Sequence, residues 1–480
     1  MPRLPPGIIR FLLALMTIAP AAANAQAFQV DARTEAQVYS MRAYRDTTPT
    51  DPVLLPRRRL VQYLSLDGYE LITGQPLGFE ASMRIFTDFG LPQGEAQKVD
   101  GLKTTDFDLL LANAYYKNTF SDGSALHVRI GRQTYSDVTE MLAFDGAYVR
   151  YVFKGGLGAE VYGGLWVKGS NDLSSSVYQP DGIRESDLRR VALMQAAPYA
   201  ALDDIEPLVG AKLLAQNAFG TGVSASAGYR QSWLSGKIDT QIFTLDARWT
   251  KWKGIFVGGG LEYDLLMMRL GNARLLARYD GTDLAVSAEL MHVDPIFAAD
   301  SIFLYFATAQ RDEARLRLDI YGAGPIRTYV ALVGDSYGTN LNSTIPTAII
   351  TKTPMTPATT LSSPLSGGGN LGATFRSNGF RASADLTYKR GYGGTQFWAD
   401  LAGGFTPEGG LFTLDARLSY ANIRDSQNLL LHGDFFGAQI WGSWFLSHST
   451  RASVMLEENV NPFTKSDTKV FLIFDWKVTI

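Results

Sequence analysis

Apolar and polar side chains alternate one by one along the stretch 125–153. Apolar positions carry residues such as Val128 and Val149, and the positions between them carry cations such as Arg129 and Arg150. A period of two is that of a β-strand whose two faces meet different surroundings. A soluble sandwich would turn the apolar face into a core. A membrane barrel would turn it into lipid and the arginines into its lumen.

The same alternation recurs through almost the whole chain after residue 26. It predicts strands in many stretches, among them 32–42, 57–66, 79–89, 107–116, 157–167, 243–249, 313–320, 380–389, 412–420 and 470–480. No linker divides these stretches into separate domains. The pattern therefore favours one large all-β unit, residues 26–480.

The connections between the strands form two classes. Short segments rich in Gly, Asn or Ser alternate with longer ones, and outer-membrane barrels place short turns on the periplasmic side and long loops outside. The longer stretches are Leu91–Lys103, Thr134–Ala143, Gly169–Ile205, Asp294–Asp312, Thr339–Gly369, Asn422–Gly433 and Asn459–Thr468. We expect a single antiparallel transmembrane β-barrel with an even number of strands, about 18 to 22, and long extracellular loops at 169–205 and 339–369.

The first 25 residues look like a secretory signal peptide. Arg3 and Arg10 form a positive start, Phe11–Ile18 is apolar, and Ala23-Asn24-Ala25 is a small-x-small cleavage site. The apolar run is too short for a spanning helix. We place the cleavage after Ala25.

Composition narrows the choice further. The chain has no cysteine, although an exported protein of this size could use disulfides. After the signal, no apolar run is long enough for a transmembrane helix. The formal net charge of −3 argues against nucleic acid as a partner. An exported chain with these properties is typical of the bacterial outer membrane, where a barrel satisfies its backbone by strand pairing alone.

Aromatic residues add a weaker sign. Trp249 with Trp252, Trp441 with Trp444, and Trp476 fall near strand ends. Interfacial belts of barrels use such rings at the level of the lipid headgroups. Each ring alone would fit ordinary packing equally well.

No catalytic constellation stands out. The four histidines, His127, His292, His432 and His448, have no metal-ligand spacing. No serine lies in a recognisable nucleophile motif, and no glycine pattern suggests a phosphate cradle. We expect no enzyme activity, no metal and no cofactor.

The informative chemistry is the charge on the inner face. If the strand phase is right, a set of arginines projects into the lumen: Arg84, Arg129, Arg150, Arg248, Arg315, Arg317, Arg381 and Arg417. Acidic residues share that face almost evenly. The two signs either pair to brace the wall, or the arginines line a path that binds anionic or sugar solutes, because Arg offers a fork to carboxylates.

Antiparallel pairing of the two segments in 125–153 has one odd consequence. If Arg132 lies opposite Asp145, Val128 meets Val149 and Arg129 meets Tyr148, but Arg132 and Asp145 both fall on the lipid face. A lone charge at mid-bilayer costs roughly 2–4 kcal/mol and far less near the interface. We expect the two side chains to pair at the outer rim; the other solution is a bulge at Gly131 that turns Arg132 inward.

The residues Ile130–Gln133, followed by Phe144–Gly146, resemble a motif of the alginate-export type of bacterial outer-membrane porins. Those barrels have Gly-Arg-Gln at a strand end and Asp-Gly at the start of the next strand. The resemblance covers about thirty residues and implies an electropositive tunnel for a secreted polymer, with Arg129 and Arg150 as lumen cations. The mixed charge of the inferred lumen departs from that family's pattern.

These observations lead to three functional hypotheses. The first is a passive conduit for export of a polysaccharide, with outer-membrane lipid and periplasmic export machinery as partners. The second is a general or solute-specific diffusion porin for small hydrophilic solutes. The third is a non-conducting structural barrel of an envelope complex.

Overall fold

The structure is a computed structural model that describes residues 27–44, 52–90, 105–136, 141–167, 206–234, 236–294, 310–322, 324–338, 365–392, 394–424, 432–462 and 464–479. The expected signal peptide, residues 1–25, and the expected loop 169–205 lie outside these residues. In the described part of the chain, no helix is long and apolar enough to cross a membrane.

The described residues form 22 strands in one sheet, together with a 3-10 turn, η1 (Ala218–Gly220). The strands are β1 (Ala27–Tyr44), β2 (Pro52–Tyr69), β3 (Leu77–Asp88), β4 (Thr105–Thr119), β5 (Ala125–Ser136), β6 (Met141–Val152), β7 (Leu157–Trp166), β8 (Pro207–Ala215), β9 (Val223–Leu234), β10 (Lys237–Trp249), β11 (Ile255–Asp264), β12 (Arg269–Asp280), β13 (Leu284–Val293), β14 (Arg311–Tyr321), β15 (Ile326–Tyr337), β16 (Leu365–Ser377), β17 (Phe380–Gly391), β18 (Gly394–Phe405), β19 (Phe412–Arg424), β20 (His432–Ser447), β21 (Thr450–Asn461) and β22 (Thr464–Thr479).

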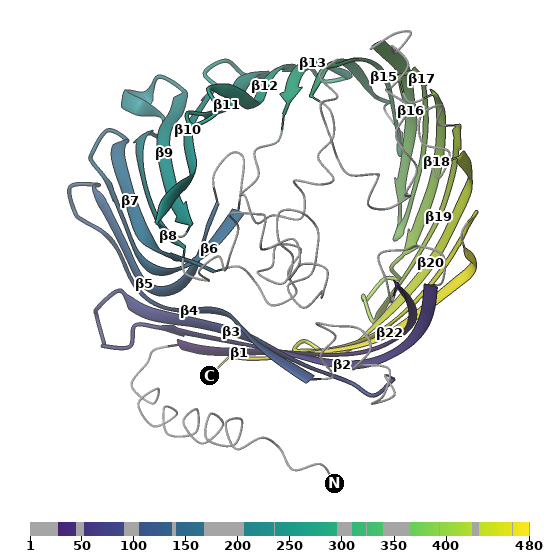
Figure 1. The fold of residues 1–480 in the computed structure, drawn as a ribbon, viewed down its shortest axis with the longest axis horizontal. Helices are drawn as coiled ribbons and strands as arrows, with labels where there is room; N and C mark the ends of the chain where they lie inside the picture. Colours follow the sequence, from purple (N-terminus) through teal and green to yellow (C-terminus); the bar gives the residue numbers. More distant parts are fainter. Residues whose placement is uncertain are drawn as a thin grey trace, which may run out of the picture.

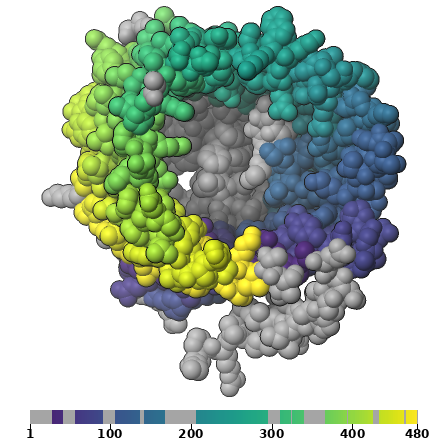
Figure 2. All heavy atoms as spheres, turned by 180° about the vertical axis from the view of Figure 1, so that it is seen from behind, coloured from purple at the N-terminus to yellow at the C-terminus, as the bar shows by residue number. Residues whose placement is uncertain are grey.

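The sheet closes on itself. Each strand pairs antiparallel with the next, and β1 also pairs with β22. Figure 1 shows the resulting ring, and Figure 2 shows its wall from the opposite end. Closure leaves no edge strand, which is how a sheet satisfies every backbone group in lipid. The expected all-β antiparallel barrel is confirmed, with a strand number at the upper end of the expected range.

The register of β5 and β6 follows from their alternating sequence. Arg132 lies opposite Asp145, and Val128 lies opposite Val149. This is the register expected from the sequence, and it is confirmed along both strands. A slip by one residue would exchange the two faces, so the apolar pattern itself selects this pairing.

The two ends of the barrel differ in their connections. We call the end with the tight links β2–β3, β4–β5 and the following even-to-odd links the turn side, and the other end the loop side. The turn of Asp122 is typical of the first: its carboxylate accepts hydrogen bonds from the Ser124 N–H at 2.9 Å and the Ser124 hydroxyl at 2.7 Å. These hydrogen bonds lower the pKa of Asp122.

Several expected loops are shorter than the sequence suggested. β16 begins at Leu365, so the last part of 339–369 is strand, and the rest of that stretch lies outside the described residues. β5 and β6 extend into 134–143, β19 and β20 into 422–433, and β21 and β22 occupy most of 459–468. Polar residues did not end these strands because the lumen and the headgroup region both accept polar side chains.

Candidate functional site

The two faces of the wall differ in chemistry. On β14, Leu316 and Ile320 are 52% and 46% exposed, whereas Glu313 and Asp319 on the opposite face are buried. A belt of large exposed apolar side chains suits lipid and not water. The apolar face is therefore the outer face, and the charged face lines the lumen. The protein is a barrel of the outer-membrane type, and its place is the bacterial outer membrane.

Aromatic rings mark the turn-side end of the outer face. Trp249 and Trp252 pack edge to face, with ring centroids 4.8 Å apart. Phe405 lies between Phe380 and Phe412, with centroid distances of 4.5 Å and 6.0 Å. This arrangement is the girdle expected where a barrel leaves the hydrocarbon.

Trp441 departs from that expectation. It belongs to the inner series of β20, and its indole N–H donates to the Ser443 hydroxyl at 2.9 Å. Ser443 in turn is 2.8 Å from the Ser453 hydroxyl. Its neighbour Trp444 lies on the outer series and is 47% exposed, because successive strand residues point to opposite faces.

Polar side chains mark the loop-side end of the outer face. His292 lies 2.7 Å from Asp312, and the Tyr420 hydroxyl donates to Asp434 at 2.8 Å. Below them, toward the turn side, the outward positions are apolar. We call these outward polar residues the outer polar belt: Arg132, Asp145, Gln231, Gln241, His292, Asp312, Asn422 and Asp434.

Arg132 and Asp145 form a two-pronged ion pair within this belt. The Arg132 Nε and Nη2 atoms donate to the two carboxylate oxygens of Asp145, each at 2.7 Å. The Arg132 Nη1 atom donates to the Leu109 carbonyl at 2.8 Å. Every arm of the guanidinium is thus engaged, and Arg132 does not turn into the lumen. Its position in the belt supports the prediction that the pair lies at the membrane rim.

The rest of the Gly-Arg-Gln and Asp-Gly motif also serves the wall. Gly131 has a φ of +120°, and a Cβ on it would lie 2.3 Å from the Ala112 carbonyl oxygen. A Cβ on Gly146, which faces Gly131, would lie 2.0 Å from the Gly163 carbonyl oxygen. The Gln133 amide donates to the Gly146 carbonyl at 3.1 Å. The motif therefore allows the four neighbouring strands β4, β5, β6 and β7 to pack closely.

Most of the arginines expected in the lumen are paired with carboxylates of the inner face. Six of the eight have such a partner: Arg84 with Asp108, Arg150 with Glu160 (3.5 Å), Arg315 with Glu313 (2.8 Å), Arg317 with Asp319 (2.7 Å), Arg381 with Asp415 (2.6 Å) and Arg417 with Asp400 (2.9 Å). Four of these pairs join different strands and brace the wall. Arg315 and Arg317 pair with residues two positions away on β14 itself, so these two pairs neutralise charge without joining strands.

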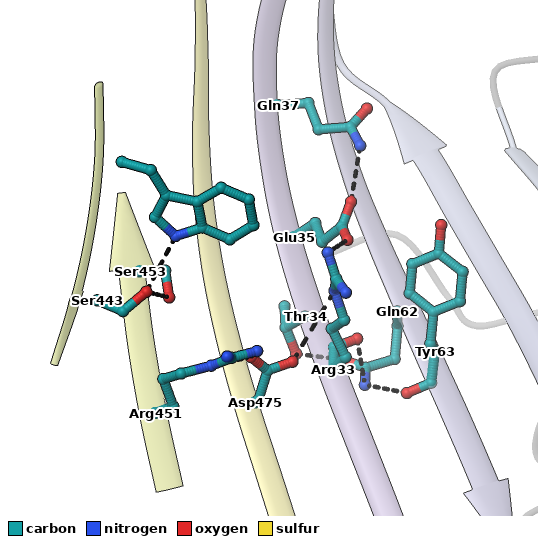
Figure 3. Close-up of polar contacts among 11 residues, drawn as sticks. Arg33, Thr34, Glu35, Gln37, Gln62, Tyr63, Ser443, Arg451, Ser453 and Asp475 are labelled. Atoms are coloured by element: carbon teal, nitrogen blue, oxygen red, sulfur yellow. Dashed lines mark hydrogen bonds and ion pairs between the residues drawn. The ribbon is translucent and has the colours of Figure 1, made fainter. Parts of the chain in front are cut away.

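The same bracing continues across the closing seam of the barrel. Asp475 of β22 accepts from Arg451 of β21 at 2.6 Å, and its other oxygen lies 3.8 Å from Arg33 of β1. Arg33 also contacts Glu35 at 2.5 Å. Figure 3 shows Arg451, Asp475 and Arg33 next to one another across the seam, with Glu35 above Arg33. One carboxylate thus links the last two strands to the first.

Arg129 and Arg248, the other two expected cations, have no carboxylate partner among the described residues. Together with Lys212 they line one cleft of about 450 Å³ on the inner wall of β5–β10. We call Arg129, Lys212 and Arg248 the first cationic cluster. Arg129 lies over the Tyr148 ring at 4.5 Å, and Lys212 over the Tyr135 ring at 5.6 Å. The paired Arg150 borders the same cleft.

A second cationic cluster lines a cleft of about 640 Å³ on the wall of β15–β20. Its members are Arg327, Arg376, Arg381 and Arg417. Arg376 lies directly opposite Arg381 in the register of β16 and β17, an arrangement of like charges that weakens a sheet. Within the described residues, neither Arg327 nor Arg376 forms an ion pair. Arg327 lies over the Tyr321 ring, at 5.5 Å.

The two clusters occupy facing sides of the ring (Figure 1). Both belong to the turn-side half, since Arg248 nearly ends β10 while Arg327 and Arg376 flank turns of that side. Lys212, Arg327 and Arg376 were not among the cations expected in the lumen from the sequence. All three occupy inward positions, so the alternation of faces along each strand would have identified them as lumen cations. No cluster of three or more His, Asp and Glu side chains suited to a metal occurs in the described residues.

No known family model matches the sequence, and no curated protein matches it. Among solved structures, the chain is similar to the siderophore receptor PirA from Pseudomonas aeruginosa, with a TM-score of 0.53 and 9% identity over 94% of this chain and 80% of that chain. It is also similar to the outer membrane protein opdK from Pseudomonas aeruginosa (TM-score 0.41, 8% identity, 94% and 99% covered) and to a BenF-like porin from Pseudomonas fluorescens Pf-5 (0.39, 10%, 95% and 99%). The similarity to PirA shows the fold alone.

Proposed function

We propose that the protein is a passive conduit of the bacterial outer membrane that favours anionic hydrophilic solutes. The observation that carries this proposal is the pair of cationic clusters on facing walls of the turn-side half. Arg129, Lys212, Arg248, Arg327 and Arg376 form no ion pair among the described residues, so the clusters present positive charge to a passing solute. On another part of the wall, Asp67 and Glu80 lie opposite each other on β2 and β3 and present negative charge.

Cations placed side by side destabilise a barrel wall. Arg376 and Arg381 lie side by side and repel each other, which a purely structural wall would avoid. An anion between them removes that repulsion, and a guanidinium offers a fork to carboxylate or phosphate. A ring of one sign selects solutes of the other sign.

Bilayer recordings test this proposal. The variant R129Q/K212Q/R248Q removes the charge of the first cationic cluster. The control K154Q/K251Q/K253Q removes the same charge from the turns, outside the lumen wall. In a potassium chloride gradient, the reversal potential of the native barrel should indicate chloride preference. The cluster variant should lose most of it and the control should keep it. Cation preference in the native barrel, or equal effects of the two variants, contradicts the proposal.

Export of a polysaccharide is the second candidate. It is supported by the sequence resemblance at Ile130–Gln133 and Phe144–Gly146 to the alginate-export type. The contacts of that motif brace the wall, so the support lies in the likeness and not in a solute contact. Periplasmic export machinery would then be a partner. Deletion of the gene tests it: loss of surface polymer supports export, and unchanged polymer with altered solute uptake supports the diffusion porin.

A non-conducting structural barrel is the third candidate. It predicts no single-channel conductance in the same bilayers, with either variant. The expected signal peptide, residues 1–25, belongs to all three proposals. Mass spectrometry of the protein from the outer membrane should find a chain that begins after Ala25.

A further inference from the structure

The barrel wall differs in length around the ring. β1 and β2 have 18 residues each, whereas β8 has 9 and β11 has 10. On the side of the short strands, β11 and β12 are joined at the loop side by residues Leu265–Met268, which we call the apolar tip. The tip is a Leu-Leu-Met-Met sequence with no polar side chain.

Hydrogen bonds hold the backbone of the apolar tip, and its side chains are exposed. The Asp264 carboxylate accepts from the backbone N–H of Leu266 at 2.9 Å and of Met267 at 3.0 Å. Met268 has a φ of +53°, a left-handed conformation that closes the turn. Leu266, Met267 and Met268 remain 47%, 66% and 72% exposed. The fold thus satisfies the polar backbone of the turn and leaves its apolar side chains free.

A backbone hydrogen bond fixes the position of the tip along the barrel axis. The Leu265 N–H donates to the Gln241 carbonyl at 2.8 Å. Gln241 belongs to the outer polar belt, where its amide donates to the Tyr229 hydroxyl at 2.8 Å. The tip therefore starts level with the belt, at the boundary between acyl chains and headgroups, and does not extend far into water.

The outer face leads without interruption from the lipid band to the tip. Val257, Gly259, Leu261 and Tyr263 follow one another on the outward series of β11, and Leu265 is the next member. Ile238 of the neighbouring hairpin, 43% exposed, extends the same apolar surface. Amphipathic surfaces at this height bind by burying apolar area in the outer part of the acyl layer.

We propose that the apolar tip is inserted among the acyl chains of the outer leaflet and anchors the low side of the barrel in the membrane. The partner is lipid, because the tip continues an existing lipid interface. Anchoring on one side only would draw the outer leaflet down beside β9–β12, while the tall strands β1, β2, β20 and β22 extend beyond it.

Site-specific labelling tests this proposal, since the chain has no cysteine of its own. M267C carries a small environment-sensitive fluorophore in barrels reconstituted into vesicles. L275C, on the outward apolar face of β12, and S121C, in the turn between β4 and β5, serve as the two reference positions. Lipids brominated near the headgroup and at mid-chain quench from the membrane, and iodide quenches from water.

The Met267 label should be quenched by brominated lipid, more by bromine near the headgroup than at mid-chain, and protected from iodide. The Leu275 label should respond most to mid-chain bromine, and the Ser121 label to iodide. Iodide quenching of the Met267 label at the level of the Ser121 label overturns the proposal. Protection from both quenchers, with energy transfer between labelled barrels, also overturns it and indicates a second copy at the tip. M268C repeats the measurement at a second position, so that one perturbing label does not decide the result.

Discussion

Replacement of Asp145 by asparagine tests where Arg132 lies in the membrane. The substitution keeps the size of the side chain and removes one charge, so that the two-pronged ion pair becomes a single hydrogen bond from the cation to a neutral amide oxygen. The Arg132 Nη1 bond to the Leu109 carbonyl remains. The cationic side chain then stays on the outer face without its counter-charge.

The magnitude depends on depth. The side chains of Arg132 and Asp145 are 26% and 43% exposed to the surroundings of the barrel. An unpaired arginine costs about 2–4 kcal/mol at mid-bilayer and about 0–1 kcal/mol near the interface. The lost charge-assisted hydrogen bond adds about 1 kcal/mol, because one arm still reaches Leu109. At the rim, D145N should therefore lower the free energy of unfolding by about 1–2 kcal/mol, and at mid-bilayer by more than about 3 kcal/mol.

Urea unfolding of the barrel from lipid vesicles, followed by tryptophan fluorescence, gives this free energy. A double-mutant cycle with R132Q isolates the pair, and the coupling should be about 1 kcal/mol. R132Q alone should cost less than D145N, since it leaves an aspartate, the cheaper charge at a lipid face. A loss above about 3 kcal/mol in D145N refutes the rim position, and a coupling near zero refutes the ion pair.

Two further changes test the wall. D475N separates Arg451 and Arg33 from their shared carboxylate and should cost about 1 kcal/mol, because the side chains are partly exposed in the lumen; the same urea titration measures it, and an unchanged midpoint would show that the seam does not depend on this charge. G131A places a Cβ against the Ala112 carbonyl at a φ of +120° and should cost about 1–3 kcal/mol, whereas G334A, with open space around its Cβ, should change stability by less than about 0.5 kcal/mol; equal effects of the two would exclude a steric role for Gly131.

The alternation of side chains was sufficient to predict much of this fold. Strands such as β14 and β19 follow directly from their period of two, and parity places Arg132 and Asp145 on the same face once the two strands are paired in the expected register. Strand ends were harder: the sequence near Asn461 and Thr464 is polar, yet the two residues face each other across a tight hairpin. A polar sequence marks a loop only where water is the one polar surrounding. The strands of a barrel meet three polar surroundings, which are bulk water, the lumen and the lipid headgroups.

The candidate site was less predictable for a different reason. Parity shows that Arg129 points inward, but the partner of an inward charge lies on another strand whose register the sequence does not contain. Arg315 and Arg129 look alike in the sequence, although one meets Glu313 and the other meets no carboxylate among the described residues. The opposition of Arg376 and Arg381 likewise appears only once β16 and β17 are paired.

The pairing of β1 with β22 has a consequence for how a cell makes this protein. The strands that close the ring are the first and the last of the described strands, and their register runs from Gln29–Thr479 to Val38–Val470. Until β22 is in place, β1 and β21 both present open edges, and in hydrocarbon each unsatisfied backbone group costs several kcal/mol. A chain that stops before β22 would thus yield an open sheet with unpaired edges that can pair with other chains, and not a narrower pore. The ring can therefore close only after β22 has been synthesised, so closure follows the synthesis of every other described strand.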